Sequence, residues 1–268
     1  MIGRGLIGVT LALATPHASH AQRAEAVDRS ALRVCADPGA VPLSSQDGKG
    51  FENQIATALA KTLGVPVRYT WFPSGIGFYR MTLNLRRCDL VIGTVAGNDI
   101  AQTTIPYYRS SYVLVTRIKD AVTATRLDDP SLRGRTIGVQ AGTPAAQLMA
   151  RAGLLDTMRS YDLMVDNRLD SVGRRLVDDV GAGRIDAAVV WGPVGGPFAA
   201  LKPGRFRVTP LTGKKDIPLA FDIAMAVRNG EPRWRAQVDT LIRTNRATIK
   251  NILTAAHVPQ LPLAEPGA

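Results

Sequence analysis

A strand–helix–strand order that occurs twice along the chain is the feature that most limits the fold. In the first copy, the buried strand at 32–37 is followed by a helix at 51–63, whose apolar residues recur at helical spacing, and by a strand at 65–72. A second helix from residue 78 and a buried strand at 90–94 complete this copy. Alternation of this kind is typical of a parallel sheet covered by helices.

The second copy starts roughly 100 residues downstream, where the strand at 135–140 takes the place of the first strand. Arg184-Ile185-Asp186, followed by an apolar run, has the same pattern as Arg87-Cys88-Asp89 in the first copy. Two copies of one arrangement predict two lobes of similar architecture. The fold class expected is therefore α/β, with each lobe a mixed, mainly parallel sheet covered by helices.

The chain is expected to pass between the lobes twice. A strand at 112–116 is the first crossing, and a segment near 216–220 is the second. A strand at 221–227 and a final helix at 232–257 then complete lobe 1. These crossings place lobe 1 at 31–116 and 217–268 and lobe 2 at 117–216.

The amino terminus has the features of a secretory signal peptide. A short basic stretch ends at Arg4, the apolar run Leu6–Ala14 follows, and small residues precede a cleavage point after Ala21. A membrane-spanning helix needs roughly 20 apolar residues, so this run is too short, and no later segment of the sequence reaches that length. Removal of residues 1–21 on export would give a periplasmic protein without a membrane span.

Basic residues exceed acidic ones along the chain. There are 33 lysine and arginine residues against 22 aspartate and glutamate residues, a formal net charge of +11, and the signal peptide contributes only Arg4 to it. In a cytosolic protein such an excess would point to nucleic acid, but export argues against that partner. An acidic protein or another anionic surface is the partner expected.

Cys35 and Cys88 are the two cysteines of the chain. In an oxidising compartment they are expected to form a disulfide, although two buried free thiols would also fit the sequence. The bridge would close a loop of 53 residues and stabilise the fold by roughly 4 kcal/mol, because it lowers the entropy of the unfolded chain.

Five segments, in this order, resemble the amino-acid-type family of periplasmic solute-binding proteins. They are Leu32–Asp37, Gly50–Glu52, Leu63–Val67, Cys88–Val91 and Pro106–Tyr108. The resemblance covers nearly the whole mature chain. It implies the two-lobed, type II periplasmic binding-protein fold of solute-binding protein family 3.

In lobe 1 the sequence resembles a narrower branch, the MxaJ/XoxJ proteins encoded beside quinoprotein methanol dehydrogenases. The matching segments are Val34–Pro38, Gly50–Asn53, Tyr69–Pro73, Cys88-Asp89 and Pro106–Ser110. This resemblance implies a non-catalytic accessory protein that interacts with a PQQ-dependent methanol or alcohol dehydrogenase and supports its assembly or activation. The alternative is an ABC-transporter solute-binding protein for a small ligand that is not an amino acid.

Two departures from the amino-acid receptors remove the charges that would hold an amino acid. Those proteins usually bind the ligand carboxylate with an arginine about nine residues before the Pro-Tyr-Tyr proline, where this chain has Ala96-Gly97-Asn98-Asp99. They bind the ligand ammonium with a carboxylate, five residues after the aspartate of the second Gly-x-x-Asp-Ala motif, and here that position is Trp191. Because an unpaired buried charge is costly, an amino acid is not expected as the ligand.

Loops at the carboxyl ends of the strands are the usual ligand position in open α/β sheets. Here those loops carry aromatic and weakly polar side chains, which suit a neutral small molecule or the inserted side chains of a partner protein. The predicted ligand- or partner-binding cleft consists of Asp37, Trp71, Phe72, Thr94, Asn98, Asp99, Tyr107, Tyr108, Gln140, Thr143, Trp191 and Phe221. A place in the core is an equal alternative for Trp71 and Phe72, and Thr143 is most simply the cap of a helix that begins at Pro144.

Little in the sequence supports catalysis, a metal site or a cofactor. His17 and His20 belong to the signal peptide, so the mature chain keeps only His257. The Gly-x-Ser-x-Gly and calcium-loop patterns do not occur in the sequence. Glu52, at a helix start, is more simply a partner of the helix dipole than a catalytic base. Enzymatic activity, a metal and a cofactor are therefore not expected.

Overall fold

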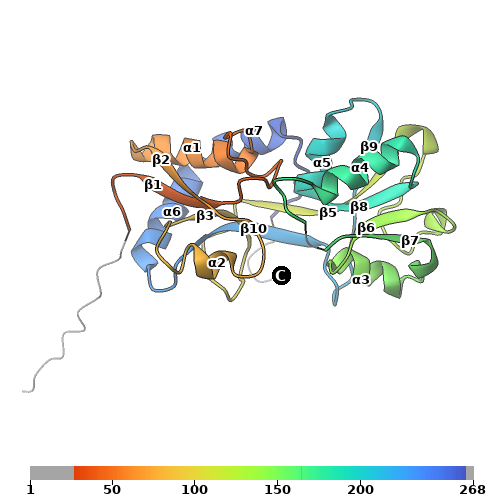
Figure 1. The fold of residues 1–268 in the computed structure, drawn as a ribbon, viewed down its shortest axis with the longest axis horizontal. Helices are drawn as coiled ribbons and strands as arrows, with labels where there is room; N and C mark the ends of the chain where they lie inside the picture. The colour runs from red at the N-terminus through yellow and green to blue at the C-terminus, as the bar shows by residue number, and fades with distance from the viewer. Residues whose placement is uncertain (1–26, 164, 264–268) are drawn as a thin grey trace, which may run out of the picture.

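The computed structural model describes residues 27–163 and 165–263, so the predicted signal peptide lies outside it. Two helix-covered halves share one extended sheet (Figure 1), in the strand order β3-β10-β5-β8-β6-β7, with β4 beside β10 and β9 beside β5. Strands β1 and β2 form a parallel pair, which a bridge between Val34 and Leu90 joins to the rest of lobe 1. This arrangement confirms the two-lobed α/β fold class.

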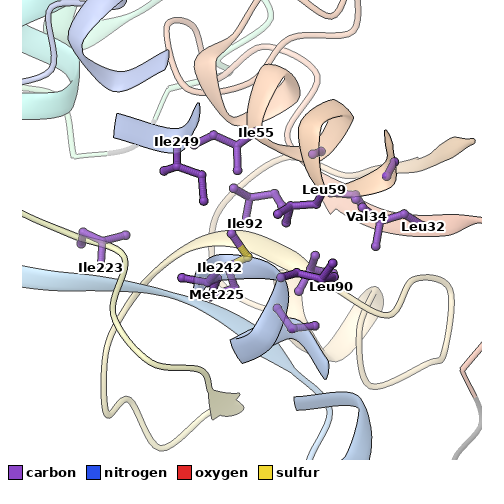
Figure 2. Close-up of a cluster of buried hydrophobic side chains, with 14 of the residues drawn as sticks. Leu32, Val34, Ile55, Leu59, Leu90, Ile92, Ile223, Met225, Ile242 and Ile249 are labelled. Carbon is purple, nitrogen blue, oxygen red and sulfur yellow. The ribbon is translucent and has the colours of Figure 1, made fainter. Parts of the chain in front are cut away.

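Lobe 1 combines the amino-terminal part of the chain with its carboxyl-terminal part. Its elements are β1 (Leu32–Ala36), α1 (Phe51–Leu63), β2 (Val67–Trp71), α2 (Phe78–Met81), β3 (Val91–Val95), β4 (Gln102–Thr103), β10 (Ala220–Val227), α6 (Pro232–Thr244) and α7 (Arg246–Ala255). Most of their apolar side chains form one buried cluster, in which Leu59 of α1, Ile92 of β3 and Ile242 of α6 meet (Figure 2). The helices thus fix the strands of lobe 1 by burying the apolar faces of both.

Lobe 2 is formed by the middle of the chain. Its elements are β6 (Ile137–Gln140), α3 (Pro144–Arg151), β7 (Met158–Tyr161), α4 (Val172–Ala182), β8 (Ala187–Trp191), α5 (Gly192–Ala200) and β9 (Phe206–Pro210). Helix α3 covers one face of the sheet, and α4 with α5 covers the other (Figure 1), each over its own apolar cluster. Within the described residues, no helix is long and apolar enough to cross a membrane.

Strand β5 (Tyr108–Arg117) belongs to both lobes. Its first four residues pair with β10 of lobe 1, and residues Tyr112–Thr116 pair with β8 of lobe 2, both antiparallel. The lobes are therefore joined by continuous backbone hydrogen bonding, in addition to the chain connections. The lobe boundaries at 31–116 with 217–268 and at 117–216 remain a prediction.

The repeated Arg-x-Asp pattern has a structural role in each lobe. Asp89 accepts hydrogen bonds from the guanidinium groups of Arg33, at 2.7 Å, and Arg228, at 2.6 Å, and is almost fully buried. Asp186 accepts from the Thr136 backbone amide at 2.9 Å and pairs with Arg117. Each aspartate thus stabilises the start of a strand, which accounts for the pattern without a function in binding.

Two expected helices differ from the structure. The helix expected from residue 78 ends at Met81 and is followed by turns, so it is only one turn long. The helix expected at 232–257 is interrupted at Asn245, where the Thr62 hydroxyl donates to the asparagine side chain and Asn245 Nδ2 donates to the Leu241 carbonyl. The spacing of apolar residues over 232–257 does not reveal this local interruption.

The Cys35–Cys88 disulfide, one of the two alternatives left open by the sequence, is present. The Cα atoms are 5.5 Å apart, and both residues are buried. The bridge connects β1 to the segment that enters β3.

Replacement of both cysteines by alanine, Cys35→Ala with Cys88→Ala, is expected to lower the free energy of unfolding by about 4 kcal/mol, because a loop of 53 residues is released in the unfolded chain. Urea unfolding followed by circular dichroism measures this change. A reducing agent should destabilise the wild type by a similar amount and leave the variant unaffected. An unchanged urea midpoint in the variant would contradict the prediction.

Candidate binding cleft

A cavity of about 450 Å³ lies between the lobes. Lobe 1 contributes residues of the 40–43 and 74–76 loops, and lobe 2 contributes Gln140, Leu163, Val194 and part of the segment 165–173. Among the described residues, every side chain that lines this cavity is apolar or neutral and polar. No described side chain of this lining carries a charge that could neutralise a ligand carboxylate or ammonium, although Asp37 and Glu52 lie in an adjoining cavity.

Large apolar side chains lie exposed at this cleft. Ile76 is 94% exposed and Leu163 is 57% exposed, on opposite lobes. Val41, on the 40–43 loop, is 46% exposed. Exposed apolar residues that gather around a cavity are typical of surfaces that bind a ligand or another protein.

Asp37 connects the lobes beside the cleft. Its carboxylate accepts hydrogen bonds from the backbone amides of Gly39, at 2.8 Å, and Ser74, at 2.6 Å, both in lobe 1. The side-chain amide of Asn167, from lobe 2, donates to the same carboxylate at 3.0 Å. A Cβ atom on Gly39 would lie 2.5 Å from the carbonyl of Asn167, so the close approach of the lobes here requires glycine.

A smaller cavity, of about 230 Å³, lies within lobe 1 and is lined by Asp37, Glu52, Phe78 and Tyr79 among others. Glu52 is half-buried in the first turn of α1, and its carboxylate lies so close to Gly93 that any larger residue there would displace it. Burial raises the pKa of the Glu52 carboxyl to about 7. The carboxyl is therefore partly protonated at neutral pH, which the assignment as a helix-dipole partner does not account for.

The predicted aromatic residues fall into separate groups. Trp191, Tyr112 and Phe221 form one cluster where β8, β5 and β10 meet, with ring centroids 5.4 and 5.9 Å apart, and Trp191 packs against the lobe 1 core. Trp71 stacks on Tyr69 at 4.5 Å. These contacts place the tryptophan rings against lobe 1 and give both a packing role.

Phe72 contacts Phe78 in a small apolar cluster around the disulfide. Tyr108 is buried in the lobe 1 core, and the Tyr107 hydroxyl donates to the Ile92 carbonyl at 3.0 Å. All three therefore have packing or backbone partners inside lobe 1.

The predicted polar residues make local hydrogen bonds. Thr94 accepts from the Tyr79 hydroxyl and from the Asn98 side-chain amide, while Asp99 is exposed. The Thr143 hydroxyl accepts from the Ala146 backbone amide at 3.2 Å, so it caps α3, with Pro144 in the first turn. These contacts stabilise turns and a helix end.

The structure therefore does not bring the twelve predicted residues together around one cavity. Gln140 lines the cleft between the lobes and donates to the Leu163 carbonyl at 3.0 Å, and Asp37 lines the smaller cavity. Sequence reasoning missed Ile76, Leu163 and Asn167, which lie in loops without a motif. An isoleucine flanked by glycines in a loop, Gly75-Ile76-Gly77, was the one signal available, because an apolar residue there has no strand or helix to bury it.

Comparison with known proteins identifies the wider relationships. No protein-family model matches the chain. MoxJ of Methylorubrum extorquens is 31% identical over 268 residues, which cover 93% of this chain and 88% of MoxJ. The chain belongs to the MoxJ/XoxJ family of periplasmic binding proteins.

Comparison with solved structures supports the assignment to this family. The periplasmic binding protein XoxJ from Methylobacterium extorquens AM1 is 37% identical, with a TM-score of 0.74 over 87% of this chain and 100% of XoxJ. An ancestral cationic amino acid solute-binding protein is 22% identical, with a TM-score of 0.68 over 85% of this chain and 96% of that one, and it shares the fold. This MoxJ/XoxJ family member thus combines a receptor fold with an uncharged cleft.

The chemistry available in the described part of this MoxJ/XoxJ protein is limited. No group of three or more histidine, cysteine, aspartate and glutamate side chains there could hold a metal ion. The two carboxylates of the smaller cavity differ in their surroundings. Asp37 accepts hydrogen bonds from three amide groups, whereas Glu52 is desolvated. The cleft itself offers apolar contact and neutral hydrogen bonds, which serve binding.

Replacement of Glu52 by glutamine is expected to stabilise the protein at pH 8 by on the order of 2 kcal/mol and to change little at pH 5. The folded chain raises the pKa of Glu52 from 4.5 to about 7, so the carboxyl binds its proton more tightly when folded. Its contribution to stability is thus present below pH 4.5 and lost as the pH rises through 7.

Urea unfolding of the wild type and of Glu52→Gln at both pH values measures this difference. Asp99→Asn, a change of an exposed carboxylate, is the matched control. Equal effects of Glu52→Gln at pH 5 and pH 8 would contradict the assigned shift.

Proposed function

We propose that this chain is a non-catalytic periplasmic accessory protein that binds a PQQ-dependent methanol or alcohol dehydrogenase and supports its assembly or activation. The observation that carries the proposal is the uncharged, apolar cleft in a member of the MoxJ/XoxJ family. The fold is that of a receptor, but the groups that would hold an amino acid are replaced. A cleft that lacks those charged groups is suited to contact with a protein partner.

The exposed residues around the cleft support a protein partner. Ile76 and Leu163 offer apolar surface on both lobes, and burial of such side chains at an interface stabilises a complex. A side chain of the partner that enters the cleft would contact both lobes together. Binding would then hold the lobes in one relative position.

The charge of the chain supports the same partner class. The full chain has a net charge of +11, and removal of Arg4 with the signal peptide leaves +10; such a protein attracts acidic proteins over distances of about one Debye length, and this attraction raises the rate of encounter. Salt weakens such steering. Periplasmic location, inferred from residues 1–21, would bring the chain into contact with an exported dehydrogenase.

The size of the cleft favours a second candidate function. About 450 Å³ lies within the range of small-molecule sites, roughly 300 to 1,000 Å³. As an ABC-transporter receptor, the protein would bind a neutral, largely apolar ligand, because the cleft offers Gln140, Asn167 and hydroxyl groups as its polar contacts. Such a ligand would be released when the purified protein is denatured.

Purified holo-form quinoprotein methanol dehydrogenase is expected to bind the immobilised mature protein in biolayer interferometry, more weakly at physiological than at low ionic strength. Ile76→Lys should weaken binding by about ten-fold or more, because it places a charge in an apolar contact. Leu201→Lys, which alters an exposed leucine at the end of α5, is the matched control and should bind as the wild type does.

The two candidate functions give opposite results. Absence of a complex with the dehydrogenase, together with a small molecule released on denaturation and identified by mass spectrometry, would replace the accessory role by the receptor role. Equal loss of binding in Ile76→Lys and Leu201→Lys would show that the cleft is not the contact surface.

A further inference from the structure

Helices α6 and α7 carry exposed cationic side chains. Arg243, Arg246 and Lys250 are exposed, and within the described residues none of the three has an ion pair. Asp239 is the single acidic residue between 232 and 255, and its carboxylate accepts a hydrogen bond from the Ile105 amide. This side of lobe 1 therefore has an unbalanced positive charge.

Lobe 2 has more ion pairs on its surface. Several of its arginine side chains pair with aspartates close by. These pairs are Arg126 with Asp128, Arg151 with Asp216, Arg168 with Asp166, Arg174 with Asp178 and Arg175 with Asp162. The surface where α6 and α7 meet thus offers a partner positive charge that no ion pair within the described residues engages.

An apolar socket of about 90 Å³ lies between Arg243 and Arg246. Its walls come from three parts of lobe 1: the segment Ile105–Tyr107, the helix residues Ile242 and Ile249, and Leu263. Figure 2 shows Ile242 and Ile249 in the buried cluster, so the floor of the socket is part of the core. The socket is consequently held in shape without a ligand.

The volume of the socket indicates the kind of group that it accepts. Small-molecule sites usually enclose at least roughly 300 Å³, whereas about 90 Å³ is close to the size of one branched or aromatic side chain. Two guanidinium groups at the rim favour carboxylates, which they can bind through paired hydrogen bonds. An apolar side chain with carboxylates beside it matches both features.

We infer that the socket between Arg243 and Arg246 binds an acidic segment of the partner protein, with one aliphatic or aromatic side chain in the socket and flanking carboxylates on the two arginines. This inference rests on the proposed function for the identity of the partner, but not for the chemistry of the segment. The α6–α7 surface then supplies charge recognition, and the cleft supplies apolar contact.

The test uses the peptide acetyl-Asp-Glu-Phe-Glu-Asp-amide as the probe, titrated into the isotope-labelled mature protein and followed by NMR. Saturable shifts are expected for the Arg243 and Arg246 side-chain N–H groups and the Ile242 and Ile249 methyl groups. A peptide with serine in place of phenylalanine should bind about ten-fold more weakly, because the socket then stays empty. Polyphosphate that binds as tightly as the peptide would overturn the inference in favour of a phosphate-bearing partner.

The double variant Arg243→Ser with Arg246→Ser is expected to weaken peptide binding by about ten-fold or more and to reduce its dependence on salt. Lys214→Ser with Lys215→Ser removes the same charge from an exposed position in lobe 2 and is the matched control. Equal weakening by both double variants would show that net charge alone causes the effect, and this would overturn the inference. Unchanged peptide binding in the arginine double variant would overturn it as well.

Binding of the dehydrogenase distinguishes the proposed function from the proposed role of the socket. A wild type that binds the peptide but not the dehydrogenase would refute the proposed function and leave the socket established. A dehydrogenase complex that the arginine double variant forms as well as the wild type would refute the socket as the docking site and leave the proposed function standing.

Discussion

The division of strand β5 between two lobes is the constraint on which the rest of the structure depends. Backbone groups of one ten-residue strand pair with β10 at one end and with β8 at the other, so each lobe completes its sheet with part of the same strand. The Trp191–Tyr112–Phe221 cluster then fills the junction of these strands. Placement of both cores follows from this shared strand, and with it the distance between the loops that form the cleft.

Charge has been removed from the cleft and retained on the surface. An amino acid in a desolvated site needs partners for two opposite charges, and the described residues that line the cleft of about 450 Å³ carry no charge. Outside it, several arginines in lobe 2 are paired with aspartates, while Arg243 and Arg246 have no ion pair within the described residues. The same fold that binds a charged solute in an ancestral cationic amino acid receptor thus presents apolar and cationic surfaces here.

Much of the fold could be predicted from the sequence, because it depends on the periodicity of apolar residues. The helix at Phe51–Leu63 and the strands β1, β3, β6 and β8 have local patterns that hydrophobic burial reinforces. The break at Asn245 could not, since it depends on a hydrogen bond from Thr62 on another helix. Local spacing contains no information about such distant partners.

The cleft was harder to predict than the fold for a physical reason. The rule that ligands bind at the carboxyl ends of strands selects Asp37 and Gln140, which do line cavities, but the loops that pack over those ends decide which other residues reach the cavity. Residues 74–76 and 165–173 have no periodicity, so neither their position nor their contact with the other lobe follows from pattern. Glu52 was at a predictable place, but its altered acidity depends on three-dimensional burial.

The hydrogen bond from Asn167 to Asp37 makes the relation between the lobes reversible. If the lobes separate, the carboxylate exchanges one side-chain amide for water and keeps the two backbone amides of Gly39 and Ser74. Separation would therefore leave no unpaired charge at Asp37, although it would also undo the packing of Gly39 against Asn167. A ligand or partner that contacts both lobes would add to this hydrogen bond and would favour the closed arrangement.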